Sequence, residues 1–358
     1  MKCPYCNREH ADTAKFCEET GKPLEPQVQY CQEKGCNFRS PLPLTALFCP
    51  NCGKPLEGRN RVQPIGMPKK IINKKTIICK PDSSCLFENT DSQIIDVSNF
   101  DTSRVTSMYL MFSGCHQVEK LDLNTFDTRN VSNMGGMFNQ CKKLRLLNLR
   151  SFDTSNVEDM GAMFYECESL SDIVLDSFDT RFVRDMSFMF TRCNKITKIS
   201  LNHLDTSQVK QMNCMFHGCA LLQNIDLHSL NTWQVEDTSC MFSHCPSLES
   251  INLSYWCLDN LLNMEDLFAY CTNLKSIDVS GWDAINPQNM NGVFNHCARL
   301  EKINMDSLII KDWPSCNKIF SRCDSLREIS MNNSDEFTIS FIRENLNKFG
   351  LRNVKIIS

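Results

Sequence analysis

A cysteine recurs every 26 residues over most of this 358-residue chain, with no insertion or deletion between copies. A phenylalanine precedes each of these cysteines by three positions, from Phe112 to Phe320. A repeat of this length predicts stacked supersecondary units, each packing its apolar side against its neighbours. We refer to these residues as the ladder cysteines; they are Cys115, Cys141, Cys167, Cys193, Cys219, Cys245, Cys271, Cys297 and Cys323.

Apolar residues recur at two different spacings within each unit. Leu121 and Leu123 alternate with polar neighbours, which predicts a short strand. A second apolar set follows at helical spacing and predicts a short helix. Its members are Val131, Met134, Met137, Phe138 and Cys141. The fold class that we expect is therefore an α/β solenoid of the leucine-rich-repeat type, with one short strand and one short helix in each 26-residue coil.

The strand positions also predict a recognition surface. Residues between and beside the inward apolar positions point out of an expected concave face, and in the middle coils they are polar and differ from coil to coil. We expect a protein or peptide to bind there. The candidate residues are Lys198, Ser200, Asn202, Asn224, Asp226, His228, Ser250, Asn252 and Ser254.

The run from Leu147 to Cys167 resembles the 26-residue repeat of BspA-type bacterial leucine-rich-repeat proteins. The resemblance implies a bacterial origin and a protein-binding role. Many such relatives are exported surface proteins, whereas Met1 here is followed at once by cysteines and not by an apolar leader. We therefore expect a cytoplasmic protein, with display at the cell surface by a non-standard route as the alternative.

The N-terminal cysteines have a different spacing, which suits a metal. Cys31, Cys36, Cys49 and Cys52 form two pairs of the kind that bind structural Zn²⁺ in a closed tetrahedral site. An earlier copy is degenerate, because Thr20 stands where its fourth cysteine belongs. A second Zn²⁺ there is uncertain; its ligands would be Cys3, Cys6, Cys17 and His10. Residues 1–58 thus resemble a double zinc ribbon.

Charge and composition divide the chain into parts. Residues 59–80 carry seven Lys/Arg and no acidic residue, whereas residues 81–358 carry 24 Lys/Arg and 35 Asp/Glu. We expect zinc ribbons at 1–58 (1–25 degenerate, 30–57 complete) and a basic linker at 59–75. An N-terminal cap and first coil follow at 76–114, then the repeat solenoid at 115–333. A cap at 334–358 contains a helix over 335–350, because a solenoid must cover its exposed end.

The sequence contains no catalytic constellation. It has no glycine-rich phosphate loop, no nucleophile elbow and no pair of histidines at metal-binding spacing. We expect a protein that is not an enzyme and has no membrane span, because no stretch approaches about 18 apolar residues. The leading hypothesis is an interaction scaffold. The alternatives are a surface adhesin, or a nucleic-acid-associated regulator that uses the zinc ribbon and basic linker, which we favour less.

Two further features have simple structural interpretations. The ladder cysteines are expected to be small buried apolar residues and not a redox array, because free cysteine is commonly buried. Cys214, Cys240, Cys257 and Cys316 lie outside the ladder and are expected to be incidental.

Overall fold

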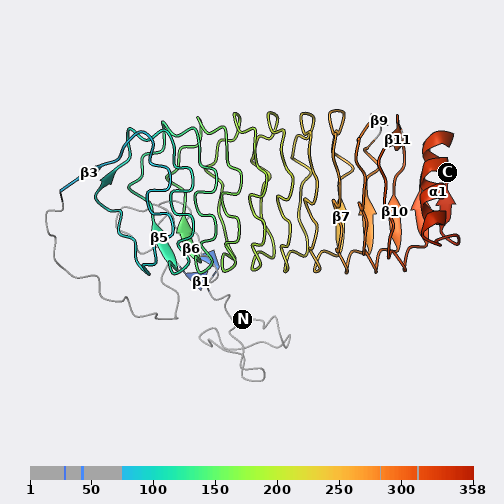
Figure 1. Ribbon diagram of the computed structural model, residues 1–358, viewed down its shortest axis with the longest axis horizontal. Coiled ribbons are helices and arrows are strands. Elements are labelled where there is room, and N and C mark those ends of the chain that lie inside the picture. Colours follow the sequence, from blue (N-terminus) through green and yellow to red (C-terminus); the bar gives the residue numbers. More distant parts are fainter. Residues whose placement is uncertain (1–27, 30–41, 44–74, 283, 313) are drawn as a thin grey trace, which may run out of the picture. The chain divides into compact units, whose positions relative to one another are not determined.

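The computed structural model describes residues 28–29, 42–43, 75–282, 284–312 and 314–358. The chain divides into two units, 1–74 and 75–358, and each is described by itself. In the first unit, β1 (Val28–Gln29) pairs antiparallel with β2 (Leu42–Pro43). The second unit is a row of stacked coils that ends in a helix (Figure 1). This geometry confirms the predicted solenoid.

Short parallel strands form at the predicted strand position in six coils. Each strand pairs with its equivalent one coil away, for example Ile251 with Ile277. β5 (Lys120–Asp122) pairs with β6 (Leu146–Asn148). A five-stranded sheet contains β7 (Ser250–Asn252), β8 (Ser276–Asp278), β10 (Lys302–Asn304), β12 (Glu328–Ser330) and β13 (Lys355–Ile357). The described residues 172–174, 198–200 and 224–226 form no strand.

The predicted short helix in each coil is wrong. In the part of the chain from residue 75 onward that the structure describes, the one α-helix is α1 (Glu336–Lys348). The segment from Asn133 to Cys141 is instead a run of tight turns that contains left-handed residues at Gly136 (φ 60°) and Gln140 (φ 57°). We call this segment, and its equivalent in every coil, the return segment.

Backbone hydrogen bonds explain why the return segment is not helical. Its alternate amides donate to the next coil: Met134 N–H to the Asp159 carbonyl at 3.0 Å, and Phe138 N–H to the Met163 carbonyl at 2.9 Å. The amides between them donate three residues back, as Cys141 does to the Phe138 carbonyl at 3.1 Å. An α-helix would direct every amide four residues back and leave none for the neighbouring coil. Stacking therefore uses the donors that a helix needs.

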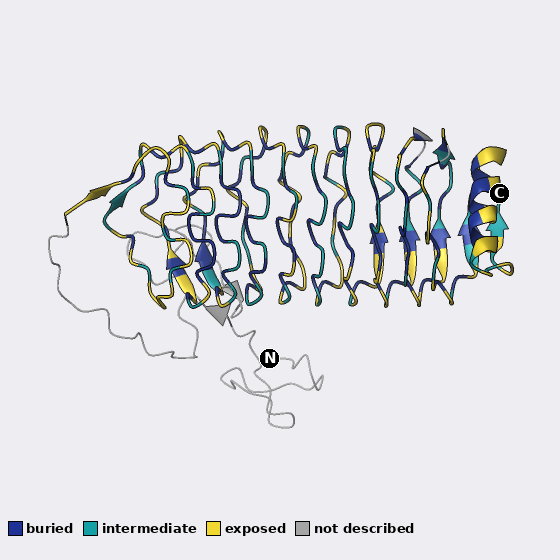
Figure 2. Cartoon of the chain, in the orientation of Figure 1, coloured by how far each residue is buried: buried dark blue, intermediate teal, exposed yellow. Residues whose placement is uncertain are grey.

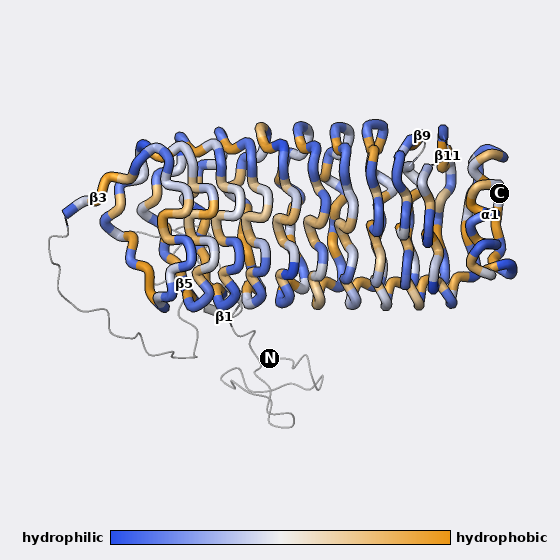
Figure 3. Tube along the Cα trace, in the orientation of Figure 1, coloured by the Kyte–Doolittle hydropathy of each residue, from blue (hydrophilic) through white to orange (hydrophobic). Residues whose placement is uncertain are grey.

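The apolar residues of the return segment nevertheless point inward as predicted. Phe112 to Phe320 form a continuous column in which neighbouring rings stack with centroids 5.5 to 5.9 Å apart. The ladder cysteines are fully buried beside them. Figure 2 shows buried positions recurring along the coils, and Figure 3 shows the matching recurrence of apolar ones. The inward set was predictable although the backbone conformation was not.

The Phe-Asp-Thr corner of each coil has a separate bonding pattern. The Thr128 hydroxyl donates to the Asp153 carbonyl at 2.9 Å and accepts from the Asp153 N–H at 2.8 Å. Equivalent threonines are buried in successive coils up to Thr232. Where the corner threonine is replaced, β9 (Ala284–Ile285) and β11 (Ile309–Ile310) pair in parallel instead. Both arrangements join coils through the backbone at this corner.

The two ends of the solenoid differ. At the start, β3 (Ile77–Ile78) pairs with β4 (Phe100–Asp101) in a first coil, and both isoleucines are exposed. At the other end, α1 follows the N-cap Asp335, whose carboxylate accepts from the Thr338 N–H. The buried Thr338 hydroxyl accepts from the Ile310 N–H at 2.9 Å. The helix thus packs onto the last coil, close to the bounds predicted for it.

Candidate functional site

The outward residues of the strand segments form one surface along the solenoid, which we call the strand face. It comprises the non-buried residues of 120–124 and of each equivalent segment up to 328–332. In the view of Figure 1 the coils stack in a nearly straight row.

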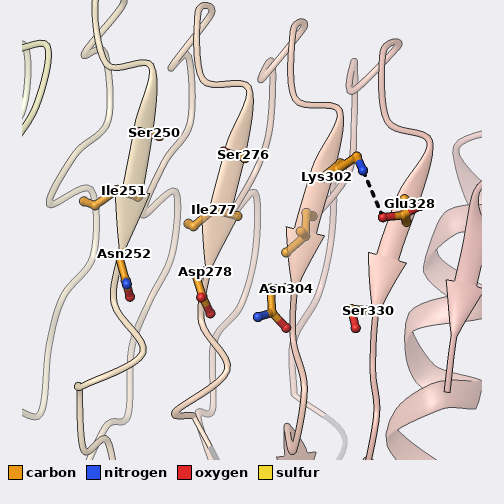
Figure 4. Close-up of a pocket in the computed structure, with 11 residues that line it drawn as sticks. Ser250, Ile251, Asn252, Ser276, Ile277, Asp278, Lys302, Asn304, Glu328 and Ser330 are labelled. Carbon is orange, nitrogen blue, oxygen red and sulfur yellow. Dashed lines mark ion pairs between the residues drawn. The ribbon is translucent and has the colours of Figure 1, made fainter.

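The strand face is hollowed locally over β7, β8, β10 and β12, where a shallow depression has a volume of about 360 Å³. Figure 4 shows Asn252, Asp278 and Asn304 projecting side by side from consecutive strands. Lys302 Nζ lies 3.2 Å from Glu328 Oε1 at one margin. Amide, carboxylate and hydroxyl groups thus line a shallow trough, as expected for contact with polar groups of a partner.

The structure places the nine predicted binding residues on the strand face. Eight are exposed and Ser254 is half-buried. Ser250 and Asn252 also line the depression, whereas the other seven lie outside its lining. The prediction thus located the surface, but its hollow begins at the last predicted coil and continues past it.

A polar cluster connects two of the predicted coils. His228 Nδ1 lies 2.7 Å from Asp226 Oδ1, and the Asn202 amide donates to Asp226 Oδ2 at 3.4 Å. Hydrogen bonding from the His228 side chain, and then from its backbone N–H, lowers the pKa of Asp226. Asp226 is therefore held as a carboxylate at neutral pH, with its acceptor geometry fixed by two neighbours.

The backbone ladder is looser in the predicted coils than in the coil that follows them. Gln223 N–H reaches the Thr197 carbonyl at 3.5 Å and Glu249 N–H reaches the Gln223 carbonyl at 3.4 Å. In the next coil, Lys275 N–H reaches the Glu249 carbonyl at 2.9 Å. The longer distances match the missing strands at 198–200 and 224–226. The predicted residues of these coils thus lie on a weakly paired backbone.

Tyr255 is an exposed aromatic residue that the sequence analysis missed. Its side chain is 67% exposed and its ring lies edge-on to His228, with centroids 6.3 Å apart. Earlier coils have threonine, serine or histidine at this position: Thr125, Ser151, Ser177, His203 and Ser229. Tyr255 is thus a large aromatic residue at a repeat position that otherwise holds small or polar residues. This was the feature of the sequence that could have revealed it. An exposed tyrosine beside a polar cluster is typical of interaction surfaces.

A second missed feature is a column of rings at the return segment. His244 stacks on Tyr270, and Tyr270 on His296, each with centroids 4.5 Å apart, while His217 lies 5.1 Å from His244. Burial, and then the neighbouring His244 and Arg192, lower the pKa of His217. The column spans four coils with no fixed residue type, so the 26-residue pattern gave no sign of it.

The ladder cysteines confirm the expectation of buried packing residues. Each thiol from Cys141 to Cys323 donates to the phenylalanine carbonyl 29 residues earlier, at 3.0 to 3.1 Å. Burial raises the pKa of Cys245 and of Cys323 to about 12. These thiols are therefore protonated at neutral pH and shielded from reagents.

The predicted zinc ligands lie outside the described residues: Cys31, Cys36, Cys49 and Cys52 of the complete ribbon, and Cys3, Cys6, Cys17 and His10 of the degenerate one. The basic linker 59–75 also lies outside them, apart from its last residue. Among the residues that the structure does describe, no cluster of three or more potential ligands is placed to bind a metal. Nor does the described part contain a helix long and apolar enough to cross a membrane.

One family model matches three overlapping stretches of the chain. The family model described as "Mycoplasma protein of unknown function, DUF285" matches residues 81–198, 169–275 and 247–349. No curated protein matches the chain.

Among 47 matching chains of solved structures is a leucine-rich-repeat protein from Bacteroides ovatus, at 16% identity and a TM-score of 0.23. That match covers 81% of this chain and 94% of the other. Another is the Toll–Spätzle complex of Drosophila, at 14% identity and a TM-score of 0.32, covering 63% of this chain and 31% of the other. At these scores, the fold rests on the geometry described above.

Proposed function

The chain belongs to the family described as "Mycoplasma protein of unknown function, DUF285", and we propose that it is a non-enzymatic scaffold that binds a protein or peptide on its strand face. One observation carries the proposal. The return segment repeats the same bonds in coil after coil, while the strand face changes its side chains from coil to coil and keeps them exposed. Repeat proteins acquire specific partners by varying the exposed side chains of one surface while the backbone of each repeat stays the same.

The chemistry of the strand face indicates an extended polar partner. The trough over β7 to β12 presents amide, hydroxyl and carboxylate groups, the preceding coil presents Asp226 and His228, and Tyr255 follows β7 in the same coil. A tyrosine anchor with surrounding hydrogen-bonding groups can bind a peptide without a deep pocket. The proposed recognition surface therefore runs from the coil of Lys198 to that of Ser330, which extends the surface predicted from sequence.

Affinity capture with the full chain as bait tests this proposal. The triple variant Ser200→Glu, Asn224→Glu and Asn252→Glu adds three negative charges to the strand face. A matched control adds the same charge at residues outside the strand face: Gln208→Glu, Gln234→Glu and Thr272→Glu. Partners identified by mass spectrometry with the wild type should decrease at least about tenfold with the first triple, equivalent to about 1.4 kcal/mol, and persist with the second. Equal recovery with both triples would reject the strand face as the binding site.

We also propose that residues 1–58 bind structural Zn²⁺ through Cys31, Cys36, Cys49 and Cys52. Four cysteines in two close pairs support this, since such a set closes the coordination sphere and holds a short segment folded. Native mass spectrometry of the full chain should show bound zinc that is lost in Cys49→Ser. A zinc content that this substitution leaves unchanged would argue against the site.

A further inference from the structure

Two cysteines outside the ladder occupy equivalent places in neighbouring coils. Cys214 and Cys240 are 26 residues apart, and each lies five residues before a ladder cysteine. Both have a left-handed backbone with φ of 55°. Both are partly exposed, unlike the fully buried ladder. The sequence analysis treated them as incidental, but the fold brings them together.

The register of the coils sets the two thiols side by side. The residue pair three positions earlier, Gln211 and Asp237, forms a parallel bridge. The Cys214 N–H donates to the Ser239 carbonyl and the Cys240 N–H donates to the Glu265 carbonyl, both at 2.8 Å. Equivalent residues of adjacent parallel coils lie about 4.8 Å apart, within the Cα separation that a disulfide spans. Because the two backbones have the same conformation, their side chains leave the surface in the same direction.

The closeness of the two thiols also affects how readily each of them ionises. The Cys240 side chain lowers the pKa of Cys214, whereas the Cys214 side chain and then burial raise the pKa of Cys240, so one thiol of the pair ionises more readily than the other. Burial and then the nearby Asp237 oppose ionisation of Cys214, and Asp266 also opposes ionisation of Cys240. This division of roles is the one that thiol–disulfide exchange requires, because the thiolate is the attacking species.

We propose that Cys214 and Cys240 are a redox-sensitive dithiol that closes into a disulfide between two consecutive coils by exchange with a low-molecular-weight disulfide. The Cys214 thiolate attacks one sulfur of the disulfide, forms a mixed disulfide and releases one small thiolate. The Cys240 thiol, on losing its proton, then attacks Cys214 Sγ and releases the second. The two protein thiols lose two electrons and two protons in total, and the small disulfide is reduced to two thiols.

The bond would join units that otherwise touch only through packing and hydrogen bonds. In a solenoid each coil is stabilised by its neighbours, so a covalent link between two coils restrains their separation. The linked coils are those of Ser200 and Asn224, which carry part of the proposed recognition surface. The proposal does not depend on a partner binding there.

Cys85 provides an internal control. It occupies the equivalent turn of the first coil, with φ of 58°, and its N–H donates to the Tyr109 carbonyl of the next coil. It is exposed, but the residue at the equivalent turn of the next coil is Leu110. An accessible thiol without a second thiol beside it should stop at the mixed disulfide.

The test is incubation of the full chain with glutathione disulfide, followed by peptide mapping under non-reducing conditions. We expect a cross-linked peptide pair containing Cys214 and Cys240, lighter by two hydrogens and split by dithiothreitol, whereas Cys85 carries glutathione. In Cys240→Ser, Cys214 should instead retain glutathione, and far-UV circular dichroism checks that this variant folds. The proposal is overturned if Cys214 and Cys240 in the wild type both carry glutathione, or if both stay reduced.

Discussion

The return segment and the strand face use the same 26 residues in different ways. In the return segment of the unit ending at Cys193, alternate amides from Met186 to Arg192 donate to the next coil at 2.7 to 3.0 Å. On the strand face just after it, residues 198–200 form no strand, and the nearest coil-to-coil bond is 3.5 Å long. The difference indicates that the return segment stabilises the stacked coils through its hydrogen bonds, while the residues of the strand face are free to vary. Each prediction below perturbs one side and uses the other as its reference.

The largest effect is expected from the phenylalanine column. Phe190→Ala removes a fully buried ring stacked at 5.5 Å on both Phe164 and Phe216. We expect the free energy of unfolding in urea to fall by about 3–5 kcal/mol, because the cavity cannot be filled by neighbouring coils. The control is Phe182→Ala, which truncates a ring that is 55% exposed in the same repeat. If both substitutions lower the free energy of unfolding by the same amount, the phenylalanine column does not stabilise the fold.

The corner threonines should give the next largest effect. Thr128→Val keeps the shape but removes the hydroxyl that both donates to and accepts from the backbone of Asp153. Both backbone groups of Asp153 lose their partner, so we expect a loss of about 2 kcal/mol in the free energy of unfolding. Thr125→Val, an exposed threonine in the same coil, should change it by less than about 0.5 kcal/mol. Calorimetry of the two variants measures both changes. Equal losses for Thr128→Val and Thr125→Val would contradict this ranking.

A smaller effect, of opposite sign, is expected from Asp159→Asn. Burial, and then the charge of Asp185, raise the pKa of Asp159 above 3.8. A carboxyl whose pKa is higher in the folded protein than in the unfolded chain destabilises the fold as pH rises from 3.8 through the folded pKa. The amide removes this charge and can still accept from the Gly161 N–H, as Asn133 does from Gly135 in the previous coil. We expect a gain of less than about 1 kcal/mol at pH 7 that vanishes below pH 3.8.

That gain should be visible as a higher urea midpoint at pH 7 and an unchanged one at pH 3. A midpoint that is equally raised at both pH values would show that charge is not the cause. A lower midpoint at pH 7 would mean that the carboxylate itself stabilises the return segment.

The smallest effect concerns the strand face. In His228→Ala, the pKa of Asp226 should rise toward 3.8, because the side-chain hydrogen bond that lowers it is removed. In the wild type, the stabilisation from this lowered pKa is lost as pH falls from 3.8 through the folded value. NMR titration of the Asp226 carboxyl measures the change directly. An unaltered titration would show that His228 does not hold the carboxylate in solution.

The sequence predicted period, packing side and terminal cap because each depends on where apolar residues fall. Met134, Met137, Phe138 and Cys141 are buried as expected, and α1 begins one residue inside its predicted range. Helical spacing did not imply a helix, because a run of left-handed turns also brings these positions to one side. Glycine at 136 hinted at such a turn, but Gln140 occupies the left-handed region without any sign in the sequence.

The candidate site was predictable in place but not in detail. The outward polar residues follow from strand alternation, so eight of nine are exposed as expected. Tyr255 and the Cys214–Cys240 pair were missed because they interrupt the repeat and do not belong to it. The depression over β7 to β12 depends on the side chains of four coils together, which no single coil reveals.

Amide hydrogen exchange of the free protein tests most directly whether the return segment carries the fold. The donors at Met186, Phe188, Phe190 and Arg192 should be protected, while those at 198–200 should exchange at least about tenfold faster. The paired strand β8 serves as the protected reference on the strand face. Protection of 198–200 equal to that of β8, or rapid exchange at the return-segment donors, would contradict the division of roles described here.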